Sequence, residues 1–491
     1  MRATTLLLLL SACTGKGDPS PADDSASTAD DTGAPATPEA CGYTAAEDLD
    51  PSDEIVEVNL SAADLAWDPG TGTPLDDGLA FNGTVPGPLF EATVGQTLRV
   101  NFTNDTDMDL TLHWHGLRVS PEMDGIMQMM DPVVPGGTFT YDLELKDTGF
   151  YWYHPHMSTD LTLERGLYGG IIVRTADEGR ADCELPLMLD DILLDDRTWQ
   201  ILPPDTDMNQ LMGRLGNLLM TNGKADRQVA LTQGQSVLLR LVNAANARFF
   251  DLYLEGHTLT VVGTDGGFLA EPYEVDTLLV APGERYIVQV DATGEPGETY
   301  RLMSKRFQLH DEDHSDMMEF DPLGDEDQPV MSFVYGEGSV TGTAWVQPTP
   351  DVPSWTGETE TLGHTWELDE DMDAGTVFID GESWPDVPMV TVTANTDTTF
   401  VIDNKSEMHH PFHIHGNRFQ IVAIDGAPPE HVQGWKDTWS VSPMSTVTVV
   451  SALDNPGEWM YHCHILEHAE KGMAGLMTVE EAEDSGMEML R

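Results

Sequence analysis

The chain has few basic residues for its size. Its 491 residues include only 23 Lys and Arg but 85 Asp and Glu, so the formal net charge is −62. A field of this sign repels phosphate backbones, which argues against nucleic acid as a partner. It also concentrates cations, including cationic substrates and metal ions, near the surface. A solvated acidic shell adapted to salty surroundings explains the same composition, and composition alone leaves both interpretations open.

The chain also lacks a hydrophobic run long enough to cross a membrane. The apolar stretch Leu6–Leu10, which follows Arg2, is too short to span and is typical of a secretory signal. Leu10-Ser11-Ala12-Cys13 is similar to a bacterial lipobox, in which the cysteine is lipidated and becomes the first mature residue. We therefore expect residues 1–13 to be a signal segment and Cys13 to anchor the protein on the periplasmic or extracellular side of the cell envelope. An ordinary secretory signal is the alternative.

Helical patterns are scarce, whereas Gly (45) and Pro (31) are frequent. Alternating runs such as Val390–Thr399 and Ser445–Ser451 indicate short strands joined by turns. The length suits about three domains, so we predict an all-β chain of three Greek-key sandwiches. Leu211–Leu219 is the one stretch for which we expect a short helix or an ordered loop. Residues 14–50, rich in small and acidic residues over Thr14–Pro38, suit a flexible linker.

The most informative motif lies near the C-terminus and reads His462-Cys463-His464-Ile465-Leu466-Glu467-His468, followed by Met473. Alternate side chains of a strand face opposite ways, so His462 and His464 share one side while Cys463 faces the other. A thiolate, two imidazoles and a distant thioether form the ligand set of a blue copper site. One strand end could thus serve two metal centres.

Three further histidine clusters lie upstream. They are His113-Trp114-His115, His154-Pro155-His156 and His410-Pro411-Phe412-His413-Ile414-His415. His113 and His413 are separated by nearly the same distance as His154 and His462, which indicates an internal duplication. A single His-x-His pair is more often an ordinary polar strand than a ligand pair. Four such clusters, one enclosing a cysteine, make coincidence a poor explanation.

These motifs resemble those of the three-domain multicopper oxidases, the group of laccases and bacterial cuprous oxidases. The resemblance runs from about Ile55 to Val479 and includes Asn82–Pro88, Arg240–Arg248 and Ala281–Arg285. It implies three consecutive cupredoxin-like Greek-key β-sandwich domains. Their expected bounds are 51–178, 179–342 (without its own copper) and 343–482 (with the type 1 copper), followed by a tail at 483–491.

The resemblance also implies four copper ions and their ligands. It assigns the type 1 copper to His410, Cys463, His468 and Met473. It assigns the type 2 copper to His113 and His413. The two type 3 coppers would be bound by His115, His154, His156, His415, His462 and His464.

The sequence context of each cysteine suggests a different role. With Cys13 lipidated and Cys463 on copper, Cys41 and Cys183 remain. An oxidising compartment favours a disulfide between them. Two free thiols are the alternative, because separation in sequence says nothing about distance in space.

Proton supply shows one departure from the family pattern. Asp124 lies where the bacterial enzymes keep an acid that handles protons near the three-copper cluster. Those relatives usually have a glutamate directly after the second type 1 histidine, whereas this chain has Ala469 and then Glu470. We therefore expect Asp124 and Glu470 to handle protons, and Cys463 to pass electrons to its histidine neighbours.

The reductant is less constrained by sequence. Glu407 and Met408 resemble the acid and methionine that cuprous oxidases place before the corresponding type 1 histidine. With Met372, and with Asp369, Asp371 and Asp373, they could capture a cuprous ion. The long methionine-rich insertion of those enzymes is absent. A second mixed patch, His310–Met318, and the cluster Met123, Met127, Met129 and Met130 are metal-site candidates that an acidic loop and core packing explain equally well.

The resulting prediction is a laccase-like multicopper oxidase. It would couple one-electron oxidation of phenols, of cuprous ion or of other metal ions to the four-electron reduction of dioxygen to water. The alternative is a non-catalytic copper-binding or structural cupredoxin protein, but such relatives usually lack the cysteine and many of the histidines. We expect a monomer that meets a membrane only through its N-terminal lipid.

Overall fold

The computed structural model describes residues 37–202, 207–309, 321–350, 352–353, 355, 357–359, 361–372, 374–431 and 434–481. The predicted signal segment with Cys13, most of the predicted linker and the tail lie outside these residues. So do the patch His310–Met318 and Asp373. Among the described residues, no helix has the length and apolar character needed to cross a membrane.

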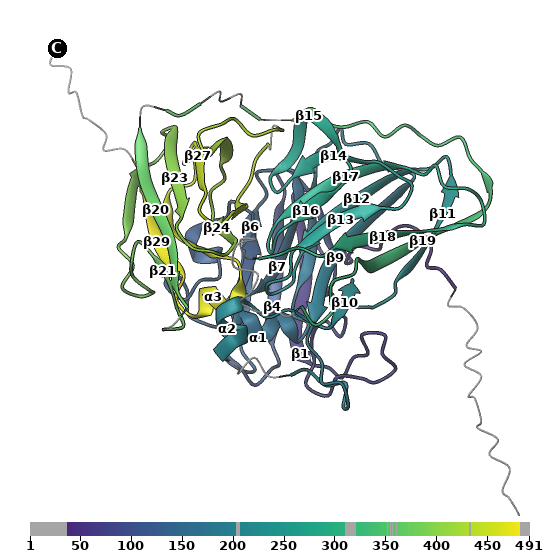
Figure 1. Ribbon diagram of the computed structural model, residues 1–491, viewed down its shortest axis with the longest axis horizontal. Helices are drawn as coiled ribbons and strands as arrows, with labels where there is room; N and C mark the ends of the chain where they lie inside the picture. Colours follow the sequence, from purple (N-terminus) through teal and green to yellow (C-terminus); the bar gives the residue numbers. More distant parts are fainter. Residues whose placement is uncertain are drawn as a thin grey trace, which may run out of the picture. The chain divides into compact units, whose positions relative to one another are not determined.

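Six β-sheets dominate the structure, and they fall into three pairs along the chain (Figure 1). The first pair has sheet orders β2-β1-β4-β6 and β3-β8-β7-β5. Its strands are β1 (Ile55–Asp64), β2 (Leu79–Phe81), β3 (Phe90–Thr93), β4 (Thr97–Asn104), β5 (Leu112–His115), β6 (Thr138–Glu144), β7 (Gly149–Pro155) and β8 (Gly169–Arg174).

The second pair has orders β10-β9-β12-β17-β14-β15 and β11-β19-β18-β13-β16. Its strands are β9 (Cys183–Ile192), β10 (Leu218–Thr221), β11 (Gln228–Gln233), β12 (Ser236–Asn243), β13 (Phe250–Leu254), β14 (Leu259–Thr264), β15 (Gly267–Val275), β16 (Leu278–Val280), β17 (Arg285–Asp291), β18 (Thr299–Lys305) and β19 (Gln328–Ser339).

The third pair has orders β21-β20-β23-β27-β25 and β22-β29-β28-β24-β26. Its strands are β20 (Leu362–Asp371), β21 (Thr376–Ile379), β22 (Val390–Thr393), β23 (Thr398–Asn404), β24 (His410–Ile414), β25 (Gln420–Ile424), β26 (Thr438–Val441), β27 (Thr446–Ser451), β28 (Gly457–Cys463) and β29 (Ala474–Glu480).

The same mixed topology recurs in all three pairs. One sheet of each pair holds a parallel contact near its start, β1 with β4, β9 with β12 and β20 with β23. The other sheet holds a second parallel contact, β3 with β8, β11 with β19 and β22 with β29. Parallel neighbours require crossover connections, which a Greek key supplies. The predicted all-β fold with three consecutive sandwiches is confirmed, and the repeat accounts for the duplicated histidine spacing.

Helices are few and short in the described chain. They are η1 (Pro121–Met123), α1 (Thr159–Glu164), α2 (Asp207–Met212) and α3 (Leu466–Glu470). The α1, α2 and α3 helices lie together, since α3 contacts both of the others (Figure 1). Of the stretch Leu211–Leu219, only the first two residues are helical, and the strand β10 begins at Leu218.

Strand burial shows how the sandwiches meet. The β4 strand alternates between intermediate and buried positions, as expected when one face is covered. The β7, β9 and β12 strands are buried along their whole lengths. The β7 strand packs on β12 and β17 of the second sandwich, which covers its outer face. A shared apolar cluster with Trp152, Val242 and Leu466 draws on all three sandwiches.

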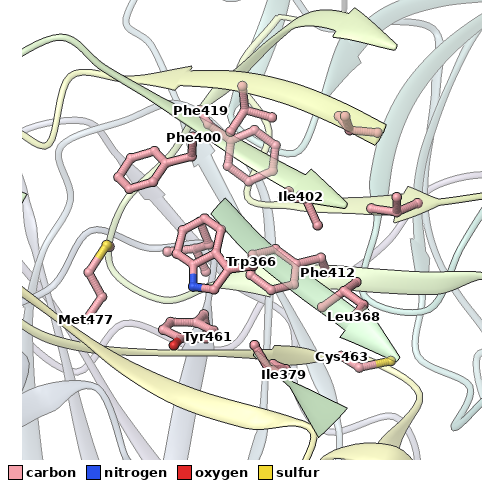
Figure 2. Close-up of a cluster of buried hydrophobic side chains, with 14 of the residues drawn as sticks. Trp366, Leu368, Ile379, Phe400, Ile402, Phe412, Phe419, Tyr461, Cys463 and Met477 are labelled. Carbon is pink, nitrogen blue, oxygen red and sulfur yellow. The ribbon is translucent and has the colours of Figure 1, made fainter. Parts of the chain in front are cut away.

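Each sandwich has its own hydrophobic core. In the third core the Trp366 ring lies 5.0 Å from the rings of Phe400 and Phe412, measured between centroids. Figure 2 shows Cys463 at one end of this cluster, with its sulfur beyond the aromatic side chains. The thiol therefore sits on a packed support, which restricts its movement.

The described end of the predicted linker is attached to the folded domains. Cys41 forms a disulfide with Cys183, with their Cα atoms 5.6 Å apart. The amide of Glu39 donates a hydrogen bond to the carbonyl of Gln228 at 2.8 Å. Residues 38–50 are therefore not a free tether, and of the two alternatives for this cysteine pair the structure has the disulfide.

Candidate metal centres

The end of β28 places one thiol between two imidazoles. Cys463 Sγ lies 3.5 Å from His410 Nδ1 and 3.7 Å from His468 Nδ1. Strand pairing of β24 with β28 sets this arrangement, because Phe412 lies opposite Cys463. All three side chains are fully buried. This is a compact trigonal set of one sulfur and two nitrogens, which suits copper.

The outer nitrogens of these imidazoles are already engaged. His468 Nε2 donates to the carbonyl of Leu211 at 2.8 Å. His410 Nε2 lies 2.8 Å from Ser406 Oγ and 3.4 Å from a carboxylate oxygen of Glu370. Such partners hold the ring orientation and leave Nδ1 of each ring for a metal ion.

Met473 belongs to the same buried core as Cys463 and is itself fully buried. Its carbonyl accepts the amide hydrogen of Cys463 at 3.0 Å. This backbone contact joins the start of β29 to the end of β28, so the predicted axial residue lies beside the thiol's strand end.

Eight further histidines gather where the first and third sandwiches meet. Strand register brings the motifs together, since His113 lies opposite His154 and His413 opposite His462. The rings form one continuous cluster, in which His113 stacks on His415 and His115 on His413, each pair with centroids 3.9 Å apart. His156, His415 and His462 are 5.0 to 5.5 Å apart. His115, His154 and His464 are 5.0 to 6.1 Å apart. His113 and His413 are 5.8 Å apart.

Hydrogen bonds leave one nitrogen available on most of these rings. The Nδ1 atoms of five rings face backbone carbonyls or a carboxylate at 2.8 to 3.0 Å. These rings are His113, His154, His413, His415 and His462. In the described part of the chain, Nε2 of His113, His154, His413 and His464 and Nδ1 of His115 have no hydrogen-bond partner. A buried polar atom without a partner costs roughly 1 to 3 kcal/mol and calls for an explanation.

Metal ions supply that explanation. Burial lowers the pKa of His154, His415 and His462, so these rings are neutral and carry a lone pair. Burial and His113 lower the pKa of His156 to about 3. Neutral imidazole is the form that binds a transition metal. The donor set therefore fits copper ions at both places.

Two buried aspartates support the histidine groups. Asp124 accepts from His415 Nδ1 at 2.8 Å, and its other carboxylate oxygen lies 3.3 Å from His113 Nδ1. Asp437 lies 3.3 Å from His115 Nε2 and 3.5 Å from His413 Nδ1. Each carboxylate thus contacts one histidine of the first sandwich and one of the third.

Comparisons with known proteins agree with this geometry. Three family models, each described as multicopper oxidase, match residues 67–178, 191–318 and 358–483. The multicopper oxidase MmcO of Mycobacterium tuberculosis is 31% identical over 440 residues, which cover 82% of this chain and 83% of that protein.

The chain belongs to the multicopper oxidase family.

Other similar proteins include laccases. Laccase-2 of Botryotinia fuckeliana is 27% identical, with 81% of this chain and 77% of that protein covered. A crystal structure of a laccase from Pediococcus acidilactici matches with a TM-score of 0.78 and 25% identity over 91% of this chain and 94% of that one. This multicopper oxidase is therefore a copper-binding, laccase-like oxidoreductase that uses dioxygen and a reductant.

The structure also describes the surroundings of the residues predicted to handle protons or to bind the reductant in this multicopper oxidase. Glu470 accepts the amide of Thr159 at 2.8 Å, at the start of α1. Met408 is fully buried, while Glu407 and Met372 are half-buried. The Glu407 amide donates to Glu370 at 3.1 Å, and a carboxylate oxygen of Glu370 lies 3.4 Å from His410 Nε2.

The methionine cluster before Pro132 is divided between packing and exposure. Met123 and Met130 pack against the first core, and Tyr141 donates its hydroxyl toward the sulfur of Met130 at 3.8 Å. Met127 is exposed. Packing accounts for two of these methionines.

Sequence reasoning missed Glu370, Ser406 and Asp437. Glu370 was overlooked within a run of acidic residues, where nothing in the pattern distinguishes a buried carboxylate from solvated ones. Ser406 stands four residues before His410, and Asp437 directly precedes a strand that pairs with the histidine strand β24. Only the folded chain shows that Ser406 contacts His410 and that Asp437 contacts His115 and His413.

Proposed function

We propose that this laccase-like multicopper oxidase binds four copper ions with the ligands inferred from the sequence. The type 1 copper takes His410, Cys463, His468 and Met473, and the type 2 copper takes His113 and His413. The type 3 pair takes the remaining six imidazoles, and His156, His415 and His462, whose ligand atoms lie within 4.8 Å of one another, support one of its two sites. Two observations support this assignment: the buried imidazole nitrogens of His113, His115, His154, His413 and His464 that lack a hydrogen-bond partner, and the compact His410–Cys463–His468 set.

Bound copper supplies one-electron oxidation at one centre and dioxygen reduction at the cluster of three. The chain keeps the two centres a short covalent distance apart, because His462 and His464 flank Cys463 on one strand end. It also keeps both centres buried, which excludes water from the ligand sets.

The Cys463→Ser variant tests the assignment. Loss of the thiolate should abolish the strong visible absorption and the oxidase activity, while the type 2 electron paramagnetic resonance (EPR) signal persists. Met389→Leu, at an exposed methionine, serves as the control and should keep both properties. A blue Cys463→Ser protein would contradict the type 1 assignment.

We propose that Asp124 and Glu470 handle protons. The Asp124 carboxylate touches rings assigned to the type 2 and type 3 coppers. Burial raises the pKa of Glu470, which favours a protonated carboxyl at the start of α1. Asp124→Asn and Glu470→Gln should each lower kcat at high pH more than at low pH, with the visible absorption intact. A uniform loss at all pH values would argue against proton delivery.

We further propose that the reductant is a small metal cation such as cuprous ion. The rings of His410 and His468 are fully buried and their outer nitrogens are hydrogen-bonded, so a bulky phenol finds no exposed imidazole edge. Burial opposes ionisation of Glu370, but the hydrogen bond and charge of His410 outweigh it, so the pKa of Glu370 is lowered and the carboxylate is anionic. Glu407, Met372 and Met408 add hard and soft donors near it, and the charge of −62 attracts cations.

Variants at this position separate the two substrate classes. Met372→Leu combined with Met408→Leu should raise the KM for cuprous ion severalfold, because the changes remove soft donors at nearly constant volume. Turnover of a dimethoxyphenol should be unchanged or improved. Equal losses on both substrates would indicate damage to the type 1 centre, and no loss on either would favour a general laccase.

We propose that the protein is anchored to the outer face of a membrane through lipid on Cys13. The lipobox-like residues 10–13 and the polar stretch after them support this location. Cys13→Ala should move the protein from the membrane fraction to a soluble one, with Ser20→Ala as a control outside the motif. An unchanged distribution would contradict the proposal.

We also propose that the protein is a monomer. Every histidine in the proposed copper sites comes from a single chain, so a second copy is not needed to complete them. Sedimentation equilibrium of the copper-loaded protein should give the mass of one chain, and a dimer mass would contradict the proposal.

A further inference from the structure

Arg285 of the second sandwich makes contacts in all three sandwiches. It stands at the first position of β17 and is fully buried. Its two terminal nitrogens lie 2.5 and 2.6 Å from the two carboxylate oxygens of Asp437, in a bidentate pair. Its Nε donates to the carbonyl of Phe150 on β7 at 3.3 Å. The fixed fork of a guanidinium thus sets both the position and the tilt of the Asp437 carboxylate.

The held carboxylate faces two imidazoles from different sandwiches. Asp437 Oδ1 lies 3.3 Å from His115 Nε2 and 3.5 Å from His413 Nδ1, which also donates to the backbone carbonyl of Asp437 at 3.0 Å. Thr438 Oγ1 lies 3.1 Å from the same two nitrogens and donates to Asp437 Oδ1 at 2.9 Å. His115 is thereby engaged through Nε2 and leaves Nδ1 available, the reverse of His413.

The neighbouring backbone is built closely around this pair. Asp265 accepts the amides of Asp437 and Thr438 at 3.1 and 3.2 Å, and it also accepts Lys436 Nζ at 3.1 Å. A Cβ atom at Gly116 would come 2.1 Å from an Arg285 nitrogen and 2.8 Å from Asp437. A side chain larger than hydrogen at position 116 would displace the guanidinium, so the glycine beside the first histidine motif keeps this space open.

We propose that Arg285 is a positioning residue for the oxygen-reducing copper cluster. It holds the Asp437 carboxylate against His115 Nε2 and, through the same residue, the backbone carbonyl that accepts from His413 Nδ1, so that the other nitrogen of each ring faces the metal. The second sandwich, which provides no copper ligand in our assignment, thereby controls the geometry of the cluster. This inference rests on the proposed ligands, since it treats His413 as a type 2 ligand and His115 as a type 3 ligand.

The test compares Arg285→Gln, Arg285→Lys and Asp437→Asn in the copper-loaded protein. The readouts are the type 2 EPR signal, the copper content per chain, and type 2 copper retention against a chelator. We expect Arg285→Gln and Asp437→Asn to lower type 2 copper affinity about 10- to 100-fold, as removal of outer-shell partners typically does. The type 1 visible absorption should remain. Arg285→Lys keeps the charge but not the fork, so it should rescue retention only in part.

Arg240 provides a matched control. It is also fully buried, lies on β12 next to β17 in the same sheet, and pairs with Glu178 away from the histidines. Arg240→Gln should reduce stability without changing the type 2 signal. Equal loss of type 2 copper in Arg240→Gln and Arg285→Gln would overturn the proposal, because general destabilisation would then explain both.

Two further outcomes are decisive. Unchanged type 2 parameters and retention in folded Arg285→Gln and Asp437→Asn would overturn the positioning role. If Arg285→Gln does not fold, the comparison of Arg285→Lys and Asp437→Asn with wild type decides in the same way. His413→Ala tests the ligand assignment separately, because a persistent type 2 signal there would refute the assignment itself rather than the role of Arg285.

Discussion

At the scale of single residues, the chemistry depends on which face of a strand each side chain occupies. Cys463 points toward the third core and to His410 and His468, while its neighbours His462 and His464 point toward the other histidines. A shift of one residue in the register of β28 would exchange these faces and destroy both ligand sets. The packing of Tyr461, on β28, against Trp366 and Phe412 favours that register.

Met473→Leu tests the axial position. Removal of a weak sulfur donor should raise the redox potential of the type 1 copper, with the visible absorption and most activity retained. Leucine has nearly the same volume, so packing in the third core should change little. The measurement is a redox titration followed by absorbance, with Met477→Leu as a control in the same core. An unchanged potential would mean that Met473 serves only as packing.

At the scale of elements, a turn of the second sandwich packs closely against a histidine of the third. Gly283 lies between β16 and β17 with φ +83°, and a Cβ atom there would come 2.8 Å from the ring of His464. Only glycine combines this backbone conformation with that closeness. The motif Ala281–Arg285 therefore supplies both a flat contact for one imidazole and the arginine that holds Asp437.

Gly283→Ala should weaken copper binding by displacing His464. We expect less copper per chain and lower activity, beyond the roughly 1 kcal/mol that a left-handed alanine costs. Gly381→Ala is the control, because Gly381 has φ +78° and a Cβ atom there would meet no other atom within 4 Å. Equal copper content in the two variants would contradict a steric role for Gly283.

Two buried carboxyl groups from the helices α1 and α3 share one buried arginine. Glu164 at the end of α1 lies 2.5 Å from Arg214, and Glu467 of α3 lies 4.0 Å from the same arginine. Burial raises the pKa of Glu164 to about 7, although Arg214 opposes the shift. One cation between two buried carboxyls cannot fully compensate both charges.

This carboxyl makes stability depend on pH. Because its pKa is about 7 in the folded state and 4.5 as the reference value, the folded protein binds more protons between these values. Stability is therefore greatest below pH 4.5 with respect to this group and falls as pH rises through 7, by up to about 3 kcal/mol. Glu164→Gln should reduce the slope of the unfolding free energy against pH in the metal-free protein. The effect should appear between about pH 5 and 8, the range set by the pKa of Glu164. Glu144→Gln, at an exposed strand position, should leave the slope unchanged, and an equal slope in wild type and Glu164→Gln would contradict the prediction.

At the scale of the whole molecule, the charge of −62 opposes compaction through self-repulsion. Salt should relieve it, since the screening length falls from about 30 Å at 0.01 M to about 3 Å at 1 M. We expect the thermal unfolding midpoint to rise steadily with sodium chloride over this range. Equimolar sucrose serves as the uncharged control. A midpoint that is insensitive to salt would show that the acidic residues are too well separated or too solvated to repel.

The sequence alone determined the fold class, the multicopper oxidase family and the copper chemistry that the family implies, whereas the copper count and the ligand assignment stay predictions. The fold class, the family and the copper chemistry follow from patterns that are local in the sequence: strands with a period of two, the His-x-His spacings, and a cysteine between two histidines. Such patterns can be recognised without knowledge of distant contacts. Domain bounds and the membrane anchor stay predictions.

Tertiary structure alone decided what surrounds those ligands. Arg285 and Asp437 are 152 residues apart in sequence, and Leu211 and His468 are 257 apart, so no local pattern links them. The disulfide between Cys41 and Cys183 and the burial of Glu370 depend likewise on how separate sandwiches pack. The physical reason is that a ligand's identity is a property of its own side chain, whereas its tautomer, orientation and access to solvent are set by neighbours that only the packed chain brings within a few ångströms.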